Sequence, residues 1–401
     1  MAGIAAVLIV TGFVVVLAYR HVAYAHELWW QFELDAHAPR SLRALAGGVL
    51  ALGVFALARL LRPASPPAAL PTSEDLDRAA ALANTSRRCN AFLALLGDKR
   101  ILFHEQGAGF LMYGVHGRGW VAVGDPIAAE PDARRELAWR FVEEADRHGG
   151  VAAFYEVGAD DLPLYLDLGL QLRKLGEEAR VPLEGFSLSG HSRAKLRQAG
   201  NRMAREGAAF DLLAAKEVPA LLDELQGISD QWLARKNTRE KSFSLGRFDR
   251  SYLARLPVAV VRKDGRIVAF ANVWAGEVKE EMSLDLMRSA DDAPPGVMEY
   301  LFAQLILWGH AQGYRWFSLG MAPLAGLEEH RLAPLWNKLG ALLFRHGEHF
   351  YNFQGLRAFK DKFDPTWEPR YLASPGGLAT PFALGHVAAL VSGGVSGVVT
   401  K

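Results

Sequence analysis

The sequence is poor in cysteine, with Cys89 as its single example among 401 residues. One cysteine excludes a disulfide within the chain and a zinc site built on cysteines. Net charge is also small, since 45 Lys and Arg residues stand against 44 Asp and Glu residues. Overall charge therefore indicates no partner. The Gly-x-Ser-x-Gly elbow and the His-Glu-x-x-His motif are missing too, so the sequence supports neither a serine hydrolase of that kind nor a zincin.

Charged residues are scarce in two segments near the start of the chain. Residues 1–18 carry none, and residues 44–61 carry only Arg59, which can extend to lipid headgroups. With their flanks, both segments approach the roughly 20 residues that a transmembrane helix needs. We expect residues 1–62 to form two transmembrane helices with a short loop. A cleaved signal peptide is the alternative for the first segment, and a buried core helix is the alternative for the second.

The composition changes after residue 62. Residues 63–73 are rich in proline, which indicates a linker between a membrane part and a globular part. The globular part is expected to hold two domains, residues 74–210 and residues 211–375. Residues 376–401 form an apolar tail rich in glycine, valine and alanine, for which membrane contact and disorder both stay open.

One order of elements occurs twice in the globular part: a β-hairpin, a long helix, a strand, a short helix and a strand. In the first half these elements are predicted at residues 109–113 with 119–123, 132–148, 151–157, 162–170 and 179–183. In the second half they are predicted at residues 257–262 with 266–274, 295–312, 314–319, 332–344 and 349–353, with another strand at 280–287. This is the layout of the GNAT acyltransferase fold. We therefore predict an α/β (α+β) protein with two tandem GNAT-like domains; an ordinary α+β protein with coincidental periodicity is the alternative.

Enzymes of the GNAT fold that use coenzyme A need a glycine-rich turn, whose N–H groups contact the pyrophosphate at a helix amino terminus. No such turn precedes the helices predicted at 132–148 and 295–312. The acyl donor is therefore predicted to be something other than coenzyme A.

A basic segment follows the first repeat and is predicted to be helical. It carries five cations before its first acid, Glu206: Arg193, Lys195, Arg197, Arg202 and Arg205. A helix face of this kind suits the phosphate oxygens of a nucleic acid. A solvated helix face is the alternative.

Three further clusters combine charges that suit a substrate site. They are Lys236, Glu240, Lys241 and Arg247 after a helix; Asp285 and Arg288 at the end of an apolar strand; and Arg357, Lys360 and Lys362 after Gly355. Arg288 can share a site with Asp285 only if a bulge interrupts the strand. Phe359 and Phe363 are expected to pack inward. A solvated surface is the alternative for each cluster.

These segments together resemble the carboxy-terminal catalytic region of the phosphatidylglycerol lysyltransferases, also called multiple peptide resistance factors. The resemblance runs from about residue 21 to residue 375 and is strongest over residues 162–207, 232–248, 282–288, 320–324 and 352–371. It implies two tandem GNAT-like domains with a cytoplasmic active site, held at the cell (inner) membrane by a multi-pass anchor. It also implies aminoacyl-tRNA as donor and phosphatidylglycerol as acceptor. Family members carry a large upstream membrane domain associated with lipid flipping, so we expect a short form or a fragment here.

The resemblance assigns roles to the clustered residues. Asp285 would orient the donor's α-amino group or act as base, while Arg288 and Lys360 would stabilise the oxyanion or hold phosphate. The remaining members of the clusters would bind substrate, and the basic helix would contact tRNA. No metal or cofactor is predicted. Lysine and alanine both stay open as the transferred amino acid. The alternatives are a Fem-like transferase acting on a peptidoglycan precursor and a non-catalytic module that binds tRNA or lipid.

Overall fold

The computed structural model describes residues 47–54, 69–191, 193–236, 238–328, 330, 353–377 and 379–392. The chain divides into two compact units, Met1–Ala64 and Ser65–Lys401. In the first unit, residues 47–54 are helical. Both predicted transmembrane segments lie largely outside the described residues, and so do the predicted helix at 332–344 and most of the strand at 349–353. Across the part of the chain that is described, no helix has the length and apolar character needed to cross a membrane.

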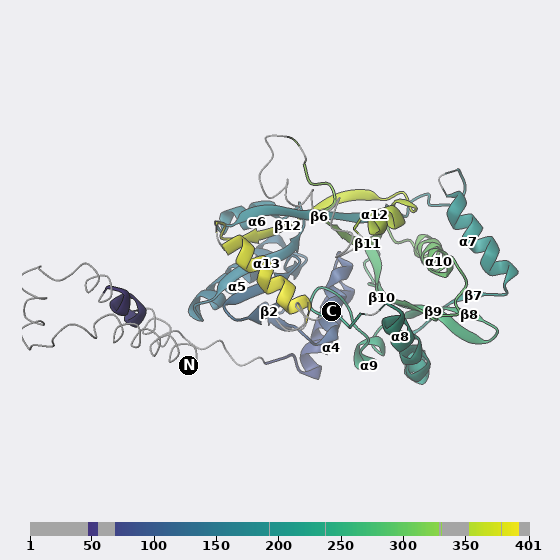
Figure 1. Cartoon of the computed structure of the whole chain (residues 1–401), viewed down its shortest axis with the longest axis horizontal. Coiled ribbons are helices and arrows are strands. Elements are labelled where there is room, and N and C mark those ends of the chain that lie inside the picture. Colours follow the sequence, from purple (N-terminus) through teal and green to yellow (C-terminus); the bar gives the residue numbers. More distant parts are fainter. Residues whose placement is uncertain are drawn as a thin grey trace, which may run out of the picture. The chain divides into compact units, whose positions relative to one another are not determined.

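Within the described residues, the second unit is built on one sheet of 12 strands (Figure 1). Their order is β1-β2-β3-β5-β12-β6-β11-β10-β9-β8-β7, and β4 pairs with β2 beside this path. The strands are β1 Arg100–Phe103, β2 Gly109–His116, β3 Gly119–Val123, β4 Ile127–Ala128, β5 Val151–Val157, β6 Gln171–Pro182, β7 Ala209–Leu213, β8 Val258–Lys263, β9 Arg266–Ala275, β10 Glu281–Ser289, β11 Trp316–Pro323 and β12 Thr366–Ser374.

The helices cover both faces of this sheet. They are α4 Ser73–Asn84, η1 Cys89–Leu96, α5 Pro131–Arg147, α6 Leu162–Asp167, α7 Ala194–Arg205, η2 Ala215–Leu221, α8 Leu222–Lys236, α9 Arg250–Leu253, α10 Val297–Ala311, α12 Phe353–Asp361 and α13 Ala379–Val391. Local chemistry sets several of their ends. Thr72 and Asp75 form a capping box at the start of α4, and Pro131 occupies the first turn of α5.

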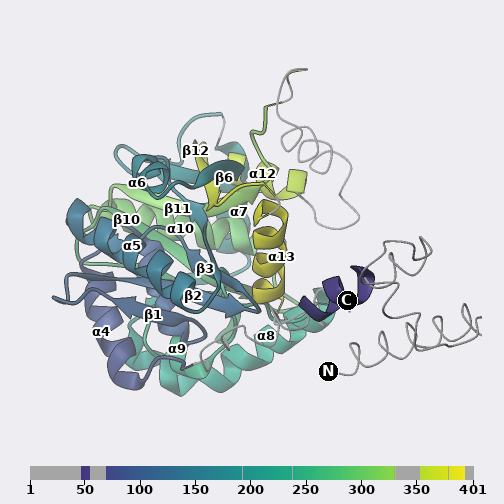
Figure 2. The ribbon, with the colours of Figure 1, turned by 90° about the vertical axis from the view of Figure 1, so that its left-hand side faces the viewer.

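Strand alternation decides which helix lies on which face. Leu111 and Tyr113 of β2 pack with α5, whereas Phe110 and Met112 pack with η1 and α13 on the opposite face (Figure 2). In the second half, Ala259 and Val261 of β8 pack with α10, and alternate residues of β8 pack with α8. Both halves therefore bury both faces of the sheet.

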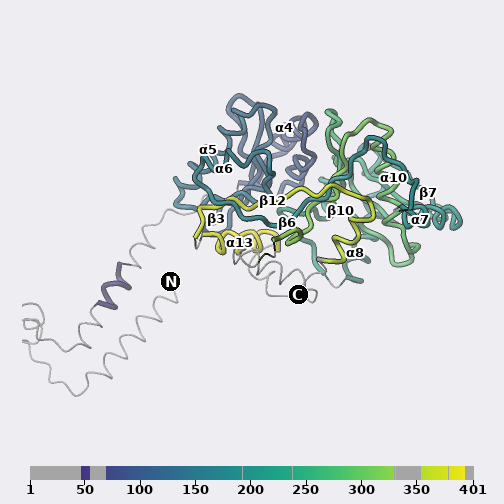
Figure 3. The backbone as a smooth tube through the Cα atoms, turned by 90° about the horizontal axis from the view of Figure 1, so that it is seen from above, coloured from purple at the N-terminus to yellow at the C-terminus, as the bar shows by residue number. Residues whose placement is uncertain are grey.

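The middle of the sheet joins the two halves. The strands β3 and β5 form one parallel pair, and β10 and β11 form another. The two pairs flank the neighbouring strands β12 and β6, one pair on each side. Between them, β12 pairs with β5 and β6, while β6 pairs with β12 and β11 (Figure 3). The last strand of the second half therefore lies between two strands of the first half.

Most predicted elements are confirmed. Both hairpins, the helix at 132–148, the strand at 151–157 and the helix at 295–312 occur within a few residues of the predicted bounds. Phe359 and Phe363 do pack inward, against Phe302. The strand predicted at 179–183 is the end of the longer β6, and Phe353, the last residue of the strand predicted at 349–353, begins α12 instead.

The predicted apolar tail contains a packed helix. α13 buries Ala383, Val387 and Ala389, and contacts β2 and β3. A Cβ atom at Gly119 of β3 would lie 2.3 Å from the ring of His386, so the missing side chain lets α13 approach the sheet. For residues 379–391, disorder is therefore the wrong alternative.

Candidate active site

A cavity of about 560 Å³ lies where the two halves meet. Its walls come from β5, β6, β10, β11, β12, η1, α12 and the loop at residues 241–245. This volume is in the usual range for a small-molecule site. Among the predicted residues, Asp285, Lys360 and Lys241 line the cavity.

Asp285 lies in a β-bulge of β10, because the register with β9 shifts between Leu284 and Met287. Its carboxylate accepts hydrogen bonds from Gly246 N and Tyr252 Oη, each at 2.8 Å. Tyr252 Oη in turn accepts from Trp274 Nε1 at 2.9 Å. Burial raises the pKa of Asp285 above its ordinary value.

Lys360 reaches the cavity from α12 and is buried. Its Nζ donates to the carbonyl oxygens of Gly320 and Met321, both at 2.8 Å. These carbonyls are exposed to Lys360 because β11 shifts register between Ser318 and Met321, with Gly320 at a φ of 77°. Burial lowers the pKa of Lys360 to about 8, against the opposing effects of Glu178 and Glu156.

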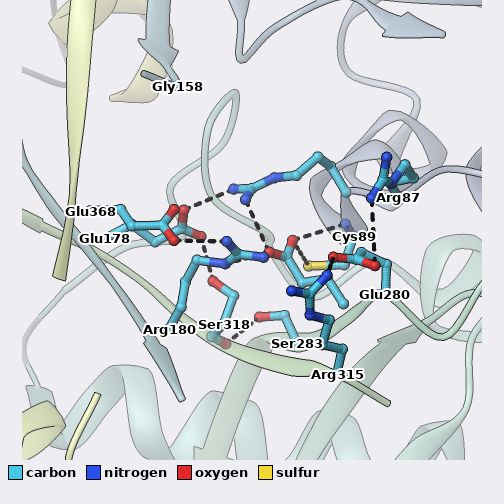
Figure 4. Close-up of polar contacts among 12 residues, drawn as sticks. Arg87, Cys89, Gly158, Glu178, Arg180, Glu280, Ser283, Arg315, Ser318 and Glu368 are labelled. Atoms are coloured by element: carbon cyan, nitrogen blue, oxygen red, sulfur yellow. Dashed lines mark hydrogen bonds and ion pairs between the residues drawn. The ribbon is translucent and has the colours of Figure 1, made fainter. Parts of the chain in front are cut away.

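A buried ion network forms one wall of the cavity (Figure 4). Glu178 accepts from Arg88 at 2.8 Å, and also from Arg370 and Ser318. Glu281 pairs with Arg88 at 3.1 Å and Arg180 at 3.0 Å. Burial alone would raise the pKa of Glu178, but Arg88 and Arg370 hold it well below its ordinary value.

Cys89 belongs to the same wall. Its backbone N and its Sγ both donate to Glu281 Oε1, at 3.1 and 3.0 Å. Burial and the neighbouring carboxylate raise the pKa of the thiol well above its ordinary value. The thiolate is therefore disfavoured, which agrees with an unreactive cysteine.

Glu156 of β5 also lines the cavity. Val157 and Tyr155 have partners in β12, but Glu156 lies between them at a register shift. Its φ is 65°, a value that residues with a side chain rarely adopt. Burial raises the pKa of Glu156 to about 7.

The other residues predicted for the site lie outside the cavity lining. Arg288 pairs with Glu240 at 3.0 Å and stacks over Trp232, although the bulge required by the prediction is present. Arg357 pairs with Glu177, and Lys362 pairs with Glu299. Lys236 is exposed at the end of α8, and Arg247 is partly exposed. The structure thus places Arg288, Lys236, Glu240, Arg247, Arg357 and Lys362 around the cavity rather than in its lining.

The basic helix α7 divides its cations into two groups. Lys195, Arg202 and Arg205 are exposed, whereas Leu196, Ala199 and Met203 are buried. Arg197 donates to the carbonyl oxygens of Leu188 and Gly190, both at 2.5 Å, and Arg193 donates to Ser187 O at 3.1 Å. Two of the five predicted tRNA contacts therefore hold the loop before the helix.

Several cavity residues were missed by the sequence reasoning: Arg88, Asp125, Glu156, Glu178, Glu281, Ser318 and Arg370. Asp125, Glu156 and Ser318 have no charged neighbour in the sequence, whereas Arg88, Glu178 and Glu281 each follow another charged residue. A weak signal exists for Glu156, which is the single charged residue in the apolar strand Val151–Val157. An isolated acid in a buried strand needs a partner or a function.

The fold and the cavity together define a mixed α/β protein with a site lined by charged residues at the centre of its sheet. A family model described as phosphatidylglycerol lysyltransferase, C-terminal, matches residues 78–374. The chain belongs to this family, which confirms the resemblance seen in the sequence over these residues.

The relatives are similar over the same region. The phosphatidylglycerol lysyltransferase of Bacillus subtilis is 41% identical over 283 residues, covering 70% of this chain and 33% of that protein. The chain thus spans about a third of the length of the curated relatives it matches.

Two solved structures cover most of the chain. One is the C-terminal domain of an Agrobacterium fabrum protein assigned as a lysylphosphatidylglycerol synthetase, with 46% identity and a TM-score of 0.73. The other is L-PGS from Bacillus licheniformis, with 36% identity and a TM-score of 0.69. Each match covers 80% of this chain and 98% of the solved chain.

Proposed function

We propose that this chain transfers an amino acid, lysine or alanine, from aminoacyl-tRNA to a headgroup hydroxyl of phosphatidylglycerol. The observation that carries the proposal is the cavity, which both the carboxylate of Asp285 and the ammonium of Lys360 line. Membership of the phosphatidylglycerol lysyltransferase family supports this acceptor over the peptidoglycan precursor of a Fem-like transferase.

The proposed reaction uses the donor's own activation. Aminoacyl-tRNA is an ester, so attack by a glycerol hydroxyl needs positive charge at the developing oxyanion and an acceptor for the hydroxyl proton. Lys360 is suited to the oxyanion, because two carbonyls fix its Nζ at the cavity wall. Asp285 is suited to the donor's α-ammonium group. Arg288 and Glu240 form an ion pair beside the β-bulge that contains Asp285, and this pair helps to position the Asp285 carboxylate.

The tRNA contact is proposed on the exposed side of α7. Lys195, Arg202 and Arg205 present three cations there without an acid between them in the sequence. This arrangement suits phosphate contacts that position a nucleic acid without reading its sequence.

The finer architecture belongs to the same proposal. Residues 74–210 and 211–375 are taken as two GNAT-like repeats that exchange their last strands, β6 and β12. Support comes from the mirrored strand order on the two sides of the sheet centre. We further propose that residues 1–62 hold the chain in the cell membrane, with the second unit in the cytoplasm, where charged tRNA is available. Lipid flipping would need a separate membrane domain.

Mass spectrometry of the phosphatidylglycerol pool, extracted from cells that express the chain, tests the proposal directly. A new lysyl or alanyl species, absent from cells with an Asp285→Ala variant of equal abundance, is the expected result. Unchanged phosphatidylglycerol, with folded protein in the membrane and charged tRNA present, would contradict it. Aminoacylated peptidoglycan precursor in the same cells would support the Fem-like alternative.

A further inference from the structure

Glu156 holds a backbone conformation that its side chain disfavours. A φ of 65° suits glycine, and a residue with a Cβ atom adopts it only where its surroundings enforce it. Here the surroundings are strong: Gly124 N donates to Tyr155 O at 2.7 Å, and β12 pairs with the residues on both sides of Glu156. Strain of this kind concentrates at functional sites.

The bulge also changes the direction of the Glu156 side chain. In a regular strand, consecutive side chains point to opposite faces of the sheet. Tyr155 and Glu156 are consecutive, yet both line the cavity. The unpaired residue of a bulge is a known means of re-aiming a side chain toward a site. The fold therefore brings a carboxylate into the cavity that strand geometry would have turned away.

Three charged groups act on Glu156 from neighbouring elements: Lys360 of α12, Glu178 of β6 and Arg370 of β12. Asp125, after β3, lines the same cavity. Arg370 is already bonded to Glu178, and Lys360 to two carbonyls. Asp125 accepts from Gly158 N and Tyr165 Oη. Tyr155 donates a hydrogen bond to the carboxylate of Glu156. Among the described residues no cation forms an ion pair with this carboxylate, so its negative charge can act on a bound substrate.

We propose that Glu156 is the catalytic base of the transfer, an assignment that rests on the proposed function. Glu156 accepts the proton of the attacking glycerol hydroxyl while a bond forms between that oxygen and the carbonyl carbon of the aminoacyl ester. The bond from this carbon to the ribose oxygen of the tRNA then breaks. The ribose oxygen takes the proton from Glu156, so the carboxylate is regenerated and no other reactant is consumed.

Asp285 is less suited to this step than Glu156. Both of its oxygens already accept hydrogen bonds, from Gly246 N and Tyr252 Oη. The pKa of Glu156, raised by burial to about 7, also lies near the pH of the cytoplasm, where a general base is most effective. Asp285 is thereby left to hold the donor's α-ammonium group.

The test uses the full chain in vesicles that contain phosphatidylglycerol, with lysyl-tRNA and alanyl-tRNA as donors. Glu156→Gln keeps the shape of the side chain and removes the base. We expect kcat to fall by about 10²- to 10⁴-fold with little change in the KM for the donor. The ascending limb of the wild-type pH–rate profile near pH 7 should disappear in this variant.

Glu156→Gly separates catalysis from structure, because glycine accepts the positive φ. We expect it to lose activity as Glu156→Gln does, with an unfolding midpoint equal to or above that of the wild type and with partial recovery in formate. Asp264→Gly is the matched control: Asp264 has a φ of 50° in the turn between β8 and β9 and does not line the cavity. This control should keep both its midpoint and its activity.

Three results would overturn the assignment. Wild-type kcat in Glu156→Gln would exclude a base, and so would a limb near pH 7 that persists in this variant. A raised donor KM with unchanged kcat would make Glu156 a binding residue for an ammonium group. If the wild type itself forms no aminoacyl lipid, the proposed function fails first, and the base assignment falls with it.

Discussion

Gly246 lies against the carboxylate of Asp285, and this contact leaves no space for a side chain. A Cβ atom at residue 246 would lie 1.7 Å from Asp285 Oδ2. We therefore expect the alanine side chain in Gly246→Ala to displace the Asp285 carboxylate from its two donors, Tyr252 Oη and the backbone N of residue 246. The free energy of unfolding should fall by about 1–3 kcal/mol, and most of the transfer activity should be lost. Urea unfolding and transfer assays measure the two effects.

Gly227→Ala is the control for this substitution. Gly227 lies within α8, and a Cβ atom there would meet nothing within 4 Å. Alanine should raise the free energy of unfolding by about 0.5–1 kcal/mol, because glycine is a poor helix former. If both variants behaved alike, the contact between Gly246 and Asp285 would have no special importance.

The titration of Glu156 predicts a pH dependence of stability. Its pKa is about 7 in the folded chain, against an ordinary 4.5, so the folded chain binds this proton more tightly than the unfolded chain does. The contribution of Glu156 to stability is therefore fully present below pH 4.5 and is lost as the pH rises through 7. Relative to Glu156→Gln, the wild type should lose on the order of 3 kcal/mol across this window.

Urea unfolding of both proteins at several pH values measures this difference, and other titrating groups cancel in the comparison. A difference that stays constant between pH 4.5 and 7 would mean that the carboxyl group titrates at its ordinary pH in the folded chain.

At the residue scale, the sequence located part of the site and missed part of it for one physical reason. Asp285, Lys241 and Lys360 stood in conspicuous polar clusters and do line the cavity. Arg288 stood in the same clusters, but stacking on Trp232 keeps it outside. Glu156 was missed because a bulge in β5, set by pairing with the distant β12, turns it inward. The sequence shows only an isolated acid in an apolar strand, and nothing local indicates that its side chain turns into the cavity.

At the element scale, the cations of α7 differ in their surroundings, since Lys195, Arg202 and Arg205 are exposed while Arg197 is partly buried. We expect alanine at Lys195, Arg202 or Arg205 to weaken tRNA binding and to lower the slope of log affinity against log salt by about 0.7–0.9 for each lost phosphate contact. Arg197→Ala should instead lower the unfolding midpoint, because its guanidinium donates to Leu188 O and Gly190 O. Filter binding over a salt series, with thermal unfolding of each variant, separates the two groups.

An equal loss of tRNA affinity in all of these variants would contradict that division of tasks. Unchanged binding in Lys195→Ala, Arg202→Ala and Arg205→Ala together would remove α7 from the tRNA surface.

Helices and strands marked by a local sequence pattern were predicted. Those whose position depends on contacts with distant strands were not. The hairpin of β8 and β9 was visible through Asp264-Gly265, a strong turn signal. β12 was missed because Pro369 argues against an inner strand; in the structure it lies beside a register shift at Arg370 and Tyr371. α13 was missed because its apolar sequence has no amphipathic pattern, and its position depends on contacts with β2, β3, β5 and β12.

At the scale of the whole second unit, the position of β12 decides whether the two proposed repeats can fold independently. β12 lies between β5 and β6, and β6 also pairs with β11, so each half completes the sheet of the other. The cavity has walls from both halves and exists only when they are joined. Residue 210, the predicted domain boundary, lies inside β7, which pairs with β8, so the folded sheet continues across it.

This arrangement predicts the behaviour of the two halves as separate chains. Residues 65–190 alone keep β5 and β6 but lack the strand between them. Residues 191–401 alone lack both neighbours of β12, while they keep β7 beside β8 and α7 beside α10. Each piece exposes unpaired strand edges, so we expect each to aggregate or to lack a cooperative unfolding transition. Coexpression should restore one transition and the transfer activity, because the missing pairings are then supplied by the partner piece. Cooperative unfolding of either piece alone would show that one repeat folds by itself, and that the exchange of β6 and β12 joins two domains that are already stable.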